Sequence, residues 1–269
     1  MNATFTDTHL HLDFAQLSDE LSDVLERART AGVTRFITIG TTLERSRQCV
    51  ELAAAHDDVW AAVGVHPSDA NELAGEDGSL NQSAIAELAK LAHRPRVVAV
   101  GEAGFDLFHD TNPAEAVQQI AFTAQGKVAA DRNLPVIIHS RDAERLSLPS
   151  LAAQADRAGE RTPGVVHCFT GSLEFAKHVL ELGYLIGFTA PVGYPKNDAL
   201  REVVRQVPLE KIMLETDAPF LPPADKRGQR NEPAYLVETA RIVAELKGVS
   251  LAELGEVTNA NANRLFGLA

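Results

Sequence analysis

The chain of 269 residues is long enough for one α/β barrel or two smaller domains, and it is 45% hydrophobic and 23% charged, as is ordinary for globular proteins. Its net charge of -12 argues against a broad basic surface for non-specific nucleic-acid binding, but not against nucleic acid held at a metal site. Two cysteines are too few for a disulfide scaffold, and no apolar stretch is long enough to span a membrane. No leader pattern precedes the first predicted strand, so we expect a cytoplasmic protein.

Strands and helices alternate along the whole chain. The first strand lies in the sequence Phe5-Thr6-Asp7-Thr8-His9-Leu10-His11-Leu12, and later strands are predicted over residues 33–39, 59–65, 97–100, 135–138, 165–168, 184–188 and 211–214. Helices are predicted over residues 16–31, 43–56, 83–92, 113–131, 142–157, 173–182, 198–207 and 234–247. A last helix, over residues 251–266, is predicted to be a C-terminal extension.

This strict alternation predicts a parallel sheet, and eight repeats of it predict closure into a (β/α)8 TIM-like barrel, a single domain spanning residues 1–269. A doubly wound open sheet is the main alternative. Residues 69–81 and 218–233 are the least structured stretches. Both follow strands, so in a barrel they lie on the catalytic face.

The first strand carries two histidines, His9 and His11, two residues apart. Side chains at this spacing point to one face of a strand, so both imidazoles can reach one ion. Asp7 shares that face and is a candidate to orient a liganding imidazole. A purely structural pair is the alternative interpretation, and the residues at the other strand ends decide between the two.

Further potential ligands follow later strands: Glu102 the fourth, His139 the fifth, His167 the sixth and Asp217 the eighth. Such groups are costly to bury unless they are paired or bind a metal. With the histidine pair they make six ligands, enough for two ions that share a bridging carboxylate. The sequence therefore predicts a binuclear site. By contrast, four histidines lie away from strand ends and are interpreted as surface residues: His56, His93, His109 and His178. Cys168 is interpreted as a packing residue.

The order of these motifs gives the chain a family resemblance. It resembles the TatD-related metal-dependent hydrolases of the amidohydrolase-like barrel superfamily over nearly its whole length. The motifs are Asp7-Thr8-His9-Leu10-His11, Val63-Gly64-Val65-His66-Pro67, Gly101-Glu102-Ala103-Gly104, Ile138-His139-Ser140-Arg141, His167-Cys168-Phe169-Thr170-Gly171, Glu215-Thr216-Asp217-Ala218-Pro219 and Arg230-Asn231-Glu232-Pro233. Each motif alone is weak, but their joint order and spacing are specific.

The resemblance implies a TIM-like barrel with one or two divalent metals, in proteins usually described as deoxyribonucleases. Carried over by motif, His9, His11 and Asp217 hold the more buried metal, Glu102 bridges, and His139 and His167 hold the more exposed one. One departure follows Gly104, where this chain has Phe105-Asp106-Leu107-Phe108-His109 and the family typically has Leu-Asp followed by aromatics. It leaves the metal site intact and bears only on the adjoining substrate wall. No lysine stands in place of Glu102, so a carbamylated-lysine bridge is not expected.

We expect hydrolysis by a water that the metals make acidic. Asp217 is the candidate to accept its proton, and Glu102, as the metal bridge, is the second candidate catalytic residue. His66 and Arg141 are candidates to bind a phosphate oxygen. Alternatively, His66 is a loop histidine that hydrogen-bonds to the backbone, and Arg141 pairs with a carboxylate at the start of the following helix. Further substrate-binding candidates are Arg230 and Asn231, and Glu215 is a candidate partner of a liganding imidazole.

The leading hypothesis is a metal-dependent deoxyribonuclease of the exonuclease type acting on DNA single strands or ends. Because only 6% of the residues are aromatic, the sequence offers no obvious stacking platform, and a short bound strand fits better than wrapped duplex. The alternatives are a binuclear ester or amide hydrolase, such as an aminoacyl-tRNA deacylase, and a non-catalytic metal-stabilised interaction module. Four imidazoles favour zinc, manganese or cobalt, whereas the family's activity is often associated with magnesium.

Overall fold

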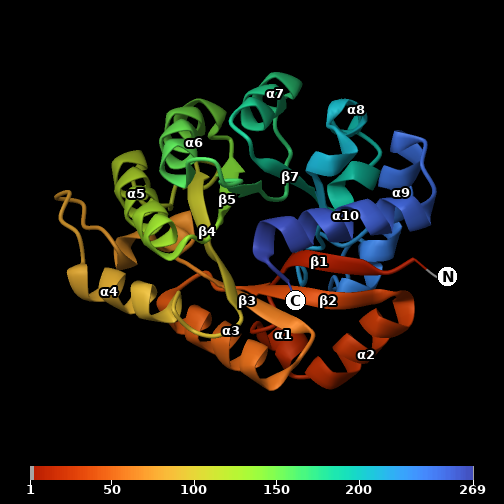
Figure 1. The fold of residues 1–269 in the computed structure, drawn as a ribbon, viewed down its shortest axis with the longest axis horizontal. Coiled ribbons are helices and arrows are strands. Elements are labelled where there is room, and N and C mark those ends of the chain that lie inside the picture. Colours follow the sequence, from red (N-terminus) through yellow and green to blue (C-terminus); the bar gives the residue numbers. More distant parts are fainter. Residues whose placement is uncertain (1–2, 269) are drawn as a thin grey trace.

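The computed structural model describes residues 3–268 and contains eight parallel strands that alternate with helices (Figure 1). Each strand hydrogen-bonds to the next one along the chain, in the order β1 to β8. The strands are β1 (Phe5–Leu10), β2 (Val33–Ile39), β3 (Val59–Val63), β4 (Val97–Asp106), β5 (Val136–Arg141), β6 (Gly164–Val166), β7 (Leu185–Phe188) and β8 (Ile212–Leu214). The predicted barrel is confirmed, and the open doubly wound sheet is excluded by this strand order.

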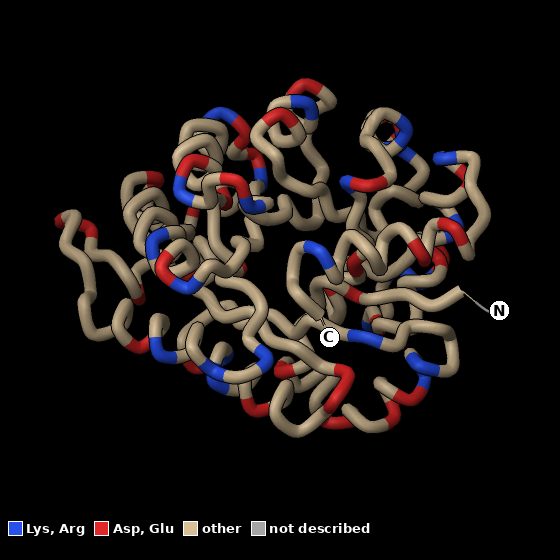
Figure 2. The backbone as a smooth tube through the Cα atoms, viewed as in Figure 1, with Lys and Arg blue, Asp and Glu red and all other residues tan. Residues whose placement is uncertain are grey.

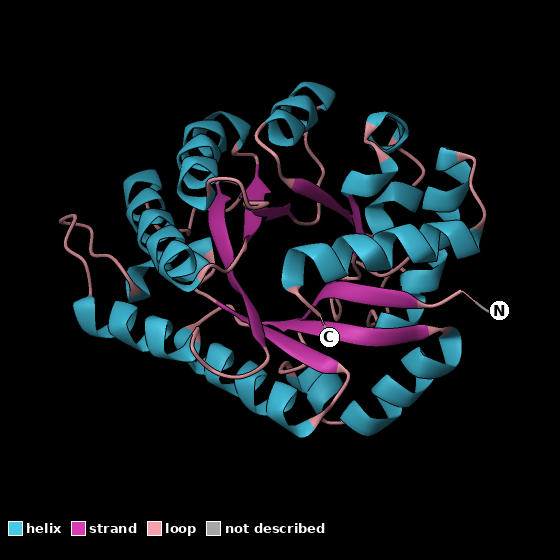
Figure 3. Ribbon diagram, in the orientation of Figure 1, coloured by secondary structure: helices cyan, strands magenta, loops and turns pink. Residues whose placement is uncertain are grey.

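The helices form a ring outside the strands (Figure 3). They are α1 (Ala15–Ser18), α2 (Leu21–Ala31), α3 (Leu43–Ala55), α4 (Gln82–Leu91), α5 (Glu115–Arg132), α6 (Glu144–Ala158), α7 (Leu173–Glu181), α8 (Asp198–Gln206), α9 (Leu236–Lys247) and α10 (Leu251–Phe266). Short 3-10 turns lie in the connections: η1 (Pro67–Glu72), η2 (Ala190–Gly193), η3 (Leu209–Lys211), η4 (Ala224–Lys226) and η5 (Pro233–Tyr235). The predicted C-terminal extension is α10.

The barrel is nearly closed, and its seam lies between β8 and β1. Across the described chain no strand ladder joins these two strands. The Thr8 hydroxyl donates to the Leu214 carbonyl at 3.0 Å, and the segment after β8 continues the seam with Asp217 N–H donating to His9 O at 2.9 Å. The seam therefore fixes the segment that carries Asp217 directly against the strand that carries His9.

The barrel interior is a separate apolar cluster with one or two residues from most strands, including Ile37, Ile137 and Met213. Leu265 and Phe266 from the end of α10 belong to the same cluster, and α10 packs on β1 and β8. Helix α10 thus closes the end of the barrel opposite the carboxyl ends of the strands. A second, larger cluster fills the space between the sheet and the outer helices.

Two elements differ from the sequence prediction. The helix predicted over residues 16–31 is broken into α1 and α2, because Glu20 leaves helical backbone angles and its carboxylate approaches Arg27 and Arg230. The fourth strand, predicted to stop at Val100, continues to Asp106 and pairs with β5 along the way. Gly101 permits this continuation, because its φ of +137° brings the backbone so near β5 that a side chain would overlap Ile137.

Charged residues of both signs are interspersed along the outer helices (Figure 2). None of the helices in residues 3–268 combines the length and apolar character that a membrane span requires.

Candidate metal centre

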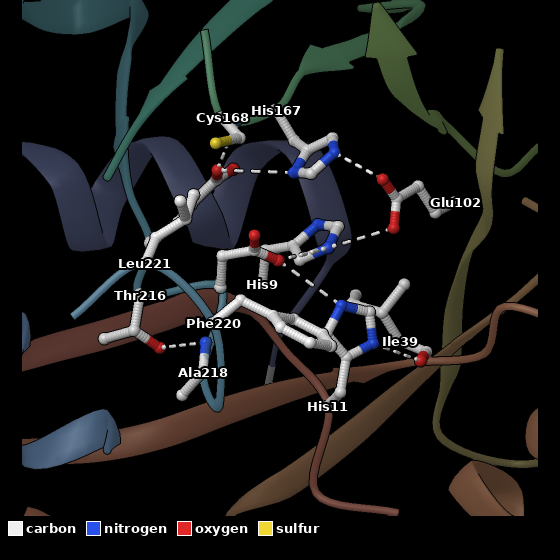
Figure 4. Close-up of polar contacts among 12 residues, drawn as sticks. His9, His11, Ile39, Glu102, His167, Cys168, Thr216, Ala218, Phe220 and Leu221 are labelled. Atoms are coloured by element: carbon white, nitrogen blue, oxygen red, sulfur yellow. Dashed lines mark hydrogen bonds and ion pairs between the residues drawn. The ribbon is translucent and has the colours of Figure 1, made fainter. Parts of the chain in front are cut away.

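Six potential metal ligands meet at the carboxyl ends of the strands. They come from β1 and the residue after it, from β4 and β5, and from the segments after β6 and β8: His9, His11, Glu102, His139, His167 and Asp217. His9, His11, Glu102 and His167 are buried, whereas His139 and Asp217 are partly exposed. Figure 4 shows the rings of His9, His11 and His167 and the Glu102 carboxylate directed toward one another. The structure therefore brings the whole predicted ligand set together.

One group of ligands consists of His9, His11 and Asp217. Asp217 Oδ1 lies 3.3 Å from His11 Nε2 and 3.6 Å from His9 Nε2. His11 Nδ1 lies 3.1 Å from the Ile39 carbonyl, which can only accept, so this nitrogen carries the proton. The lone pair of His11 Nε2 is therefore directed toward Asp217, as metal coordination requires.

The second group converges on Glu102 Oε1, which lies 2.6 Å from His139 Nδ1 and 2.5 Å from His167 Nε2. The other oxygen, Oε2, lies 3.4 Å from His9 Nε2 in the first group. Glu102 thus has one oxygen toward each group. A carboxylate in this position can bridge two ions.

Asp106 is a candidate site residue that the sequence interpretation did not single out. Its Oδ2 lies 3.3 Å from His139 Nε2 and can accept that N–H, which leaves the lone pair of His139 Nδ1 facing Glu102. The sequence interpretation named Asp106 only within the departure that follows Gly104, because the residue lies beyond the predicted end of its strand. It stands on the paired extension of β4.

The donor set fits divalent metals. Within the described chain neither ring nitrogen of the fully buried His9 has a hydrogen-bond partner, and the same is true of His167 Nδ1. Buried polar nitrogens are costly unless something binds them. The rings of His9 and His167 stack with centroids 3.8 Å apart and planes 7° apart, so their edges face the carboxylates together. Imidazole nitrogens and carboxylate oxygens at this spacing form several possible ligand groups.

Glu215 supports the cluster from behind. Its Oε2 accepts the Cys168 N–H at 2.9 Å and lies 3.9 Å from His167 Nδ1. Burial raises the pKa of Glu215 to about 7. Asp7, the expected partner of an imidazole, instead accepts from the backbone N–H and hydroxyl of Thr216, at 3.0 and 2.5 Å, and fixes the segment after β8.

His66 faces the same cavity from the end of β3. The Ser68 N–H donates to His66 Nδ1 at 3.1 Å, and Nε2 lies 3.7 Å from Glu102 Oε1. Burial lowers the pKa of His66 to about 3, so the ring is neutral and its proton is on Nε2. His66 therefore presents an N–H donor to whatever occupies the cavity.

The cavity above the cluster has a volume of about 760 Å³. Arg141 lines it with its guanidinium 3.7 Å from the centre of the Phe108 ring, rather than in the helix-start ion pair considered as an alternative. His109, interpreted from sequence as a surface residue, is exposed but also lines the cavity.

Arg230 and Asn231 are not among the lining residues. Arg230 pairs with Glu232, while the buried Asn231 amide donates to the carbonyls of Thr216, Phe220 and Leu221. These contacts hold the segment after β8 and do not reach into the cavity.

A family model described as TatD related DNase matches residues 6–267. The chain belongs to this family. It is 38% identical to the 3'-5' ssDNA/RNA exonuclease TatD of Citrobacter rodentium, with 97% of each chain covered. It is 36% identical to the metal-dependent hydrolase YabD of Bacillus subtilis, with 97% of this chain and 98% of YabD covered. The crystal structure of YjjV, a TatD homologue from Escherichia coli, superposes with a TM-score of 0.88 at 32% identity over 98% of each chain.

The TatD resemblance and the barrel expected from sequence are thus confirmed. Membership of this family makes the chain a metal-dependent hydrolase of the nuclease type.

Proposed function

We propose that this TatD-family protein is an exonuclease-type deoxyribonuclease that hydrolyses phosphodiester bonds of single-stranded DNA, at or near strand ends, with two divalent ions bound. The observation that carries the proposal is the position of Glu102, with one oxygen toward His9 and the other toward His139 and His167. The names of related TatD exonucleases support the choice of substrate. Cys49 and Cys168 are free thiols, in keeping with the reducing cytoplasm in which we place the reaction.

In this proposal His9, His11 and Asp217 hold one ion, His139 and His167 hold the other, and Glu102 bridges them. Zinc, manganese and magnesium are the candidate ions. When bound, a pair of such ions supplies a water acidic enough to attack near neutral pH and positive charge for the phosphate oxygens.

Asp217 is the proposed proton acceptor. Although burial opposes it, the adjacent imidazoles, that of His11 first, hold the pKa of Asp217 below its usual range. The side chain is therefore a carboxylate at neutral pH, and its partial exposure to the cavity lets it reach the attacking water.

His66 and Arg141 are the proposed phosphate-binding residues. The Nε2–H of His66 supplies a neutral hydrogen-bond donor, and the guanidinium of Arg141 supplies a permanent charge on the same cavity wall. The further sequence candidates, Arg230 and Asn231, are proposed to act on the substrate indirectly, by holding the segment that carries Asp217.

The proposal is tested by hydrolysis of end-labelled single-stranded DNA. Metal-stripped protein is reconstituted separately with magnesium, manganese or zinc and compared with Glu102→Ala and Asp217→Asn. We expect stepwise shortening that needs added metal and is lost in both variants. If the parent cuts nothing, or the variants cut as well as the parent, the proposal is wrong, and the same panel on carboxyl esters and aminoacyl-tRNA then tests the ester-hydrolase alternative.

A further inference from the structure

Aromatic side chains gather around the cavity although they are scarce in the chain. Phe108 and Phe220 are large apolar side chains that remain 51% and 43% exposed, respectively. Phe220 follows β8 and lines the cavity, whereas Phe108 follows β4 and lies behind the cavity-lining Arg141. Phe220 is thus exposed beside the candidate ligand His11, and Phe108 beside a residue that lines the cavity, which calls for a functional explanation.

The first group, here called the Phe220 platform, consists of Phe220, Phe14 and Arg45. The rings of Phe14 and Phe220 meet edge to face with centroids 5.4 Å apart, and the Arg45 guanidinium lies 3.8 Å from the centre of Phe14. The centroid of His11 is 5.8 Å from that of Phe220. Figure 4 shows the Phe220 ring beside His11, so this platform adjoins the first ligand group.

The second group, here called the Arg141 platform, consists of Arg141 stacked on Phe108. The Phe108 N–H donates to Asp106 Oδ1 at 3.0 Å, and Asp106 Oδ2 is the partner of His139. This hydrogen bond fixes the backbone of Phe108 relative to the second ligand group. Because Arg141 also lines the cavity, its flat guanidinium can stack on a second flat group there.

The two platforms lie at opposite ends of one row of contacts. From Phe220 the row passes through His11, Asp217, His9, Glu102, His139 and Asp106 to Phe108. The candidate metal ligands are therefore in the middle, and an aromatic ring with an arginine stands at each end. A phosphate held by the ligand row would have one platform on each side.

We propose that the two platforms each stack one unpaired base of a single-stranded polynucleotide, on either side of the phosphate that is cut. The inference rests on the proposed nuclease function and adds how the strand is held. Phenylalanine rings and guanidinium planes stack on any base, so the site reads no particular sequence. Because paired bases already stack on their neighbours, duplex cannot offer its bases to both platforms. Arg141 supplies positive charge for the phosphates in a chain of net charge -12, whereas the charge of Arg45 is paired with Asp13 at 2.7 Å.

The test measures binding of a fluorescein-labelled, cleavage-resistant phosphorothioate oligonucleotide to the metal-loaded protein by anisotropy. The variants are Phe108→Leu and Phe220→Leu, which keep an apolar side chain and remove the ring. We expect each to raise Kd about 5- to 10-fold, from the loss of one stacked base. Leu80→Ala is the matched control, because Leu80 is similarly exposed at 39% but lies outside the cavity lining, and its Kd should stay within about twofold of the parent value.

A strand without bases next to the cut separates stacking from other effects of the mutations. Such an abasic oligonucleotide lacks both stacked bases, so the parent should bind it as weakly as the double variant, with both rings removed, binds the normal strand. The double variant should lose little more. The inference would be overturned if the leucine variants bind the normal strand as tightly as the parent does. It would also be overturned if the substitutions weaken binding of the normal and the abasic strand equally. Thermal melts of all variants identify any loss that reflects misfolding.

The outcomes for the platforms and for the nuclease proposal are distinguishable. A parent that binds the oligonucleotide through the phenylalanines but cuts no DNA with any metal supports the platforms and refutes the nuclease. If the double variant without both rings cuts DNA as efficiently as the parent, the stacking inference is refuted and the nuclease proposal stands. A parent that does not bind the oligonucleotide refutes the inference.

Discussion

Gly187 of β7 lies so close to Glu215 that a methyl group on residue 187 would overlap the carboxylate. Glu215 in turn accepts the Cys168 N–H and stands 3.9 Å from His167 Nδ1. The absence of a side chain at residue 187 therefore leaves room for a buried carboxylate behind a candidate metal ligand. Partners of this kind orient an imidazole and make it a stronger ligand.

Gly187→Ala should weaken metal binding about tenfold, because it displaces Glu215 from His167. Titration calorimetry with manganese measures this affinity directly. Glu215→Gln keeps the size of the side chain but removes its charge and should weaken binding in the same direction. Gly228→Ala is the control: Gly228 has a positive φ and open space around it, so alanine strains the backbone there without touching the metal centre. Equal affinity in Gly187→Ala and the parent would contradict this role for Glu215.

Asn231→Ala should destabilise the fold by about 2 to 3 kcal/mol, because it removes the donor of three buried or partly buried hydrogen bonds to the segment after β8. The same segment carries Asp217, so we also expect a lower kcat. Urea unfolding and steady-state kinetics measure the two effects. Asn263→Ala, which removes one bond to Arg35 at an exposed position, should cost less than about 0.5 kcal/mol. Similar losses in both variants would argue against a special role for Asn231.

Glu232 gives the stability a pH dependence that can be checked by mutation. Although burial opposes it, hydrogen bonds from Arg27 and Arg230 hold the pKa of Glu232 below its ordinary value of 4.5. A lowered pKa means that the ion pair stabilises the fold above about pH 4.5 and that this contribution disappears as the pH falls through the lower folded-state value.

Glu232→Gln should therefore be less stable than the parent by about 1 to 2 kcal/mol at pH 7, and the difference should shrink below pH 4.5. Chemical denaturation at a series of pH values measures the difference. Asp198→Asn is a suitable control, because Asp198 pairs with Arg201 at a highly exposed position and should have little effect at any pH. A difference for Glu232→Gln that is independent of pH would show that the carboxylate charge contributes nothing.

Metal binding should stabilise the folded protein. A ligand present at one hundred times its Kd adds about 2.7 kcal/mol if it binds only the folded state. The melting temperature of metal-stripped protein should therefore rise on addition of manganese or zinc. Glu102→Ala removes the carboxylate that contacts both ligand groups and should abolish most of this rise. A rise of equal size in the variant would show that the stabilising ion binds elsewhere.

Local patterns predicted which potential ligands meet, because their positions depend on strand ends. His9 and His11 share a face through their spacing alone, and the parallel strands deliver Glu102, His139 and His167 to one end of the barrel. The extent of β4 could not be predicted, because glycines normally weaken strands. In the structure Gly101 and Gly104 instead admit the backbone of β5 at close range, and the strand runs on to Asp106.

The platforms could not be predicted either. Phe14, Phe108 and Phe220 follow three different strands, and the low aromatic content suggested that no stacking surface existed. Only the closed barrel places their loops around one cavity. Arg230 and Asn231 were interpreted from their motif as substrate-binding residues. In the structure they contact other residues of the chain: Asn231 donates to Thr216 O, and Arg230 pairs with Glu232.

The seam between β8 and β1 has a consequence for how the protein is made. Asp7 and Thr216, which hold the two sides together, are 209 residues apart in sequence, and the interior is sealed only by the later helix α10. A ribosome must therefore release nearly all of this region before β1 finds its final neighbour. Until then the apolar edge of β1 is open to other chains, so the emerging polypeptide should depend on chaperone protection more than its stable finished form suggests.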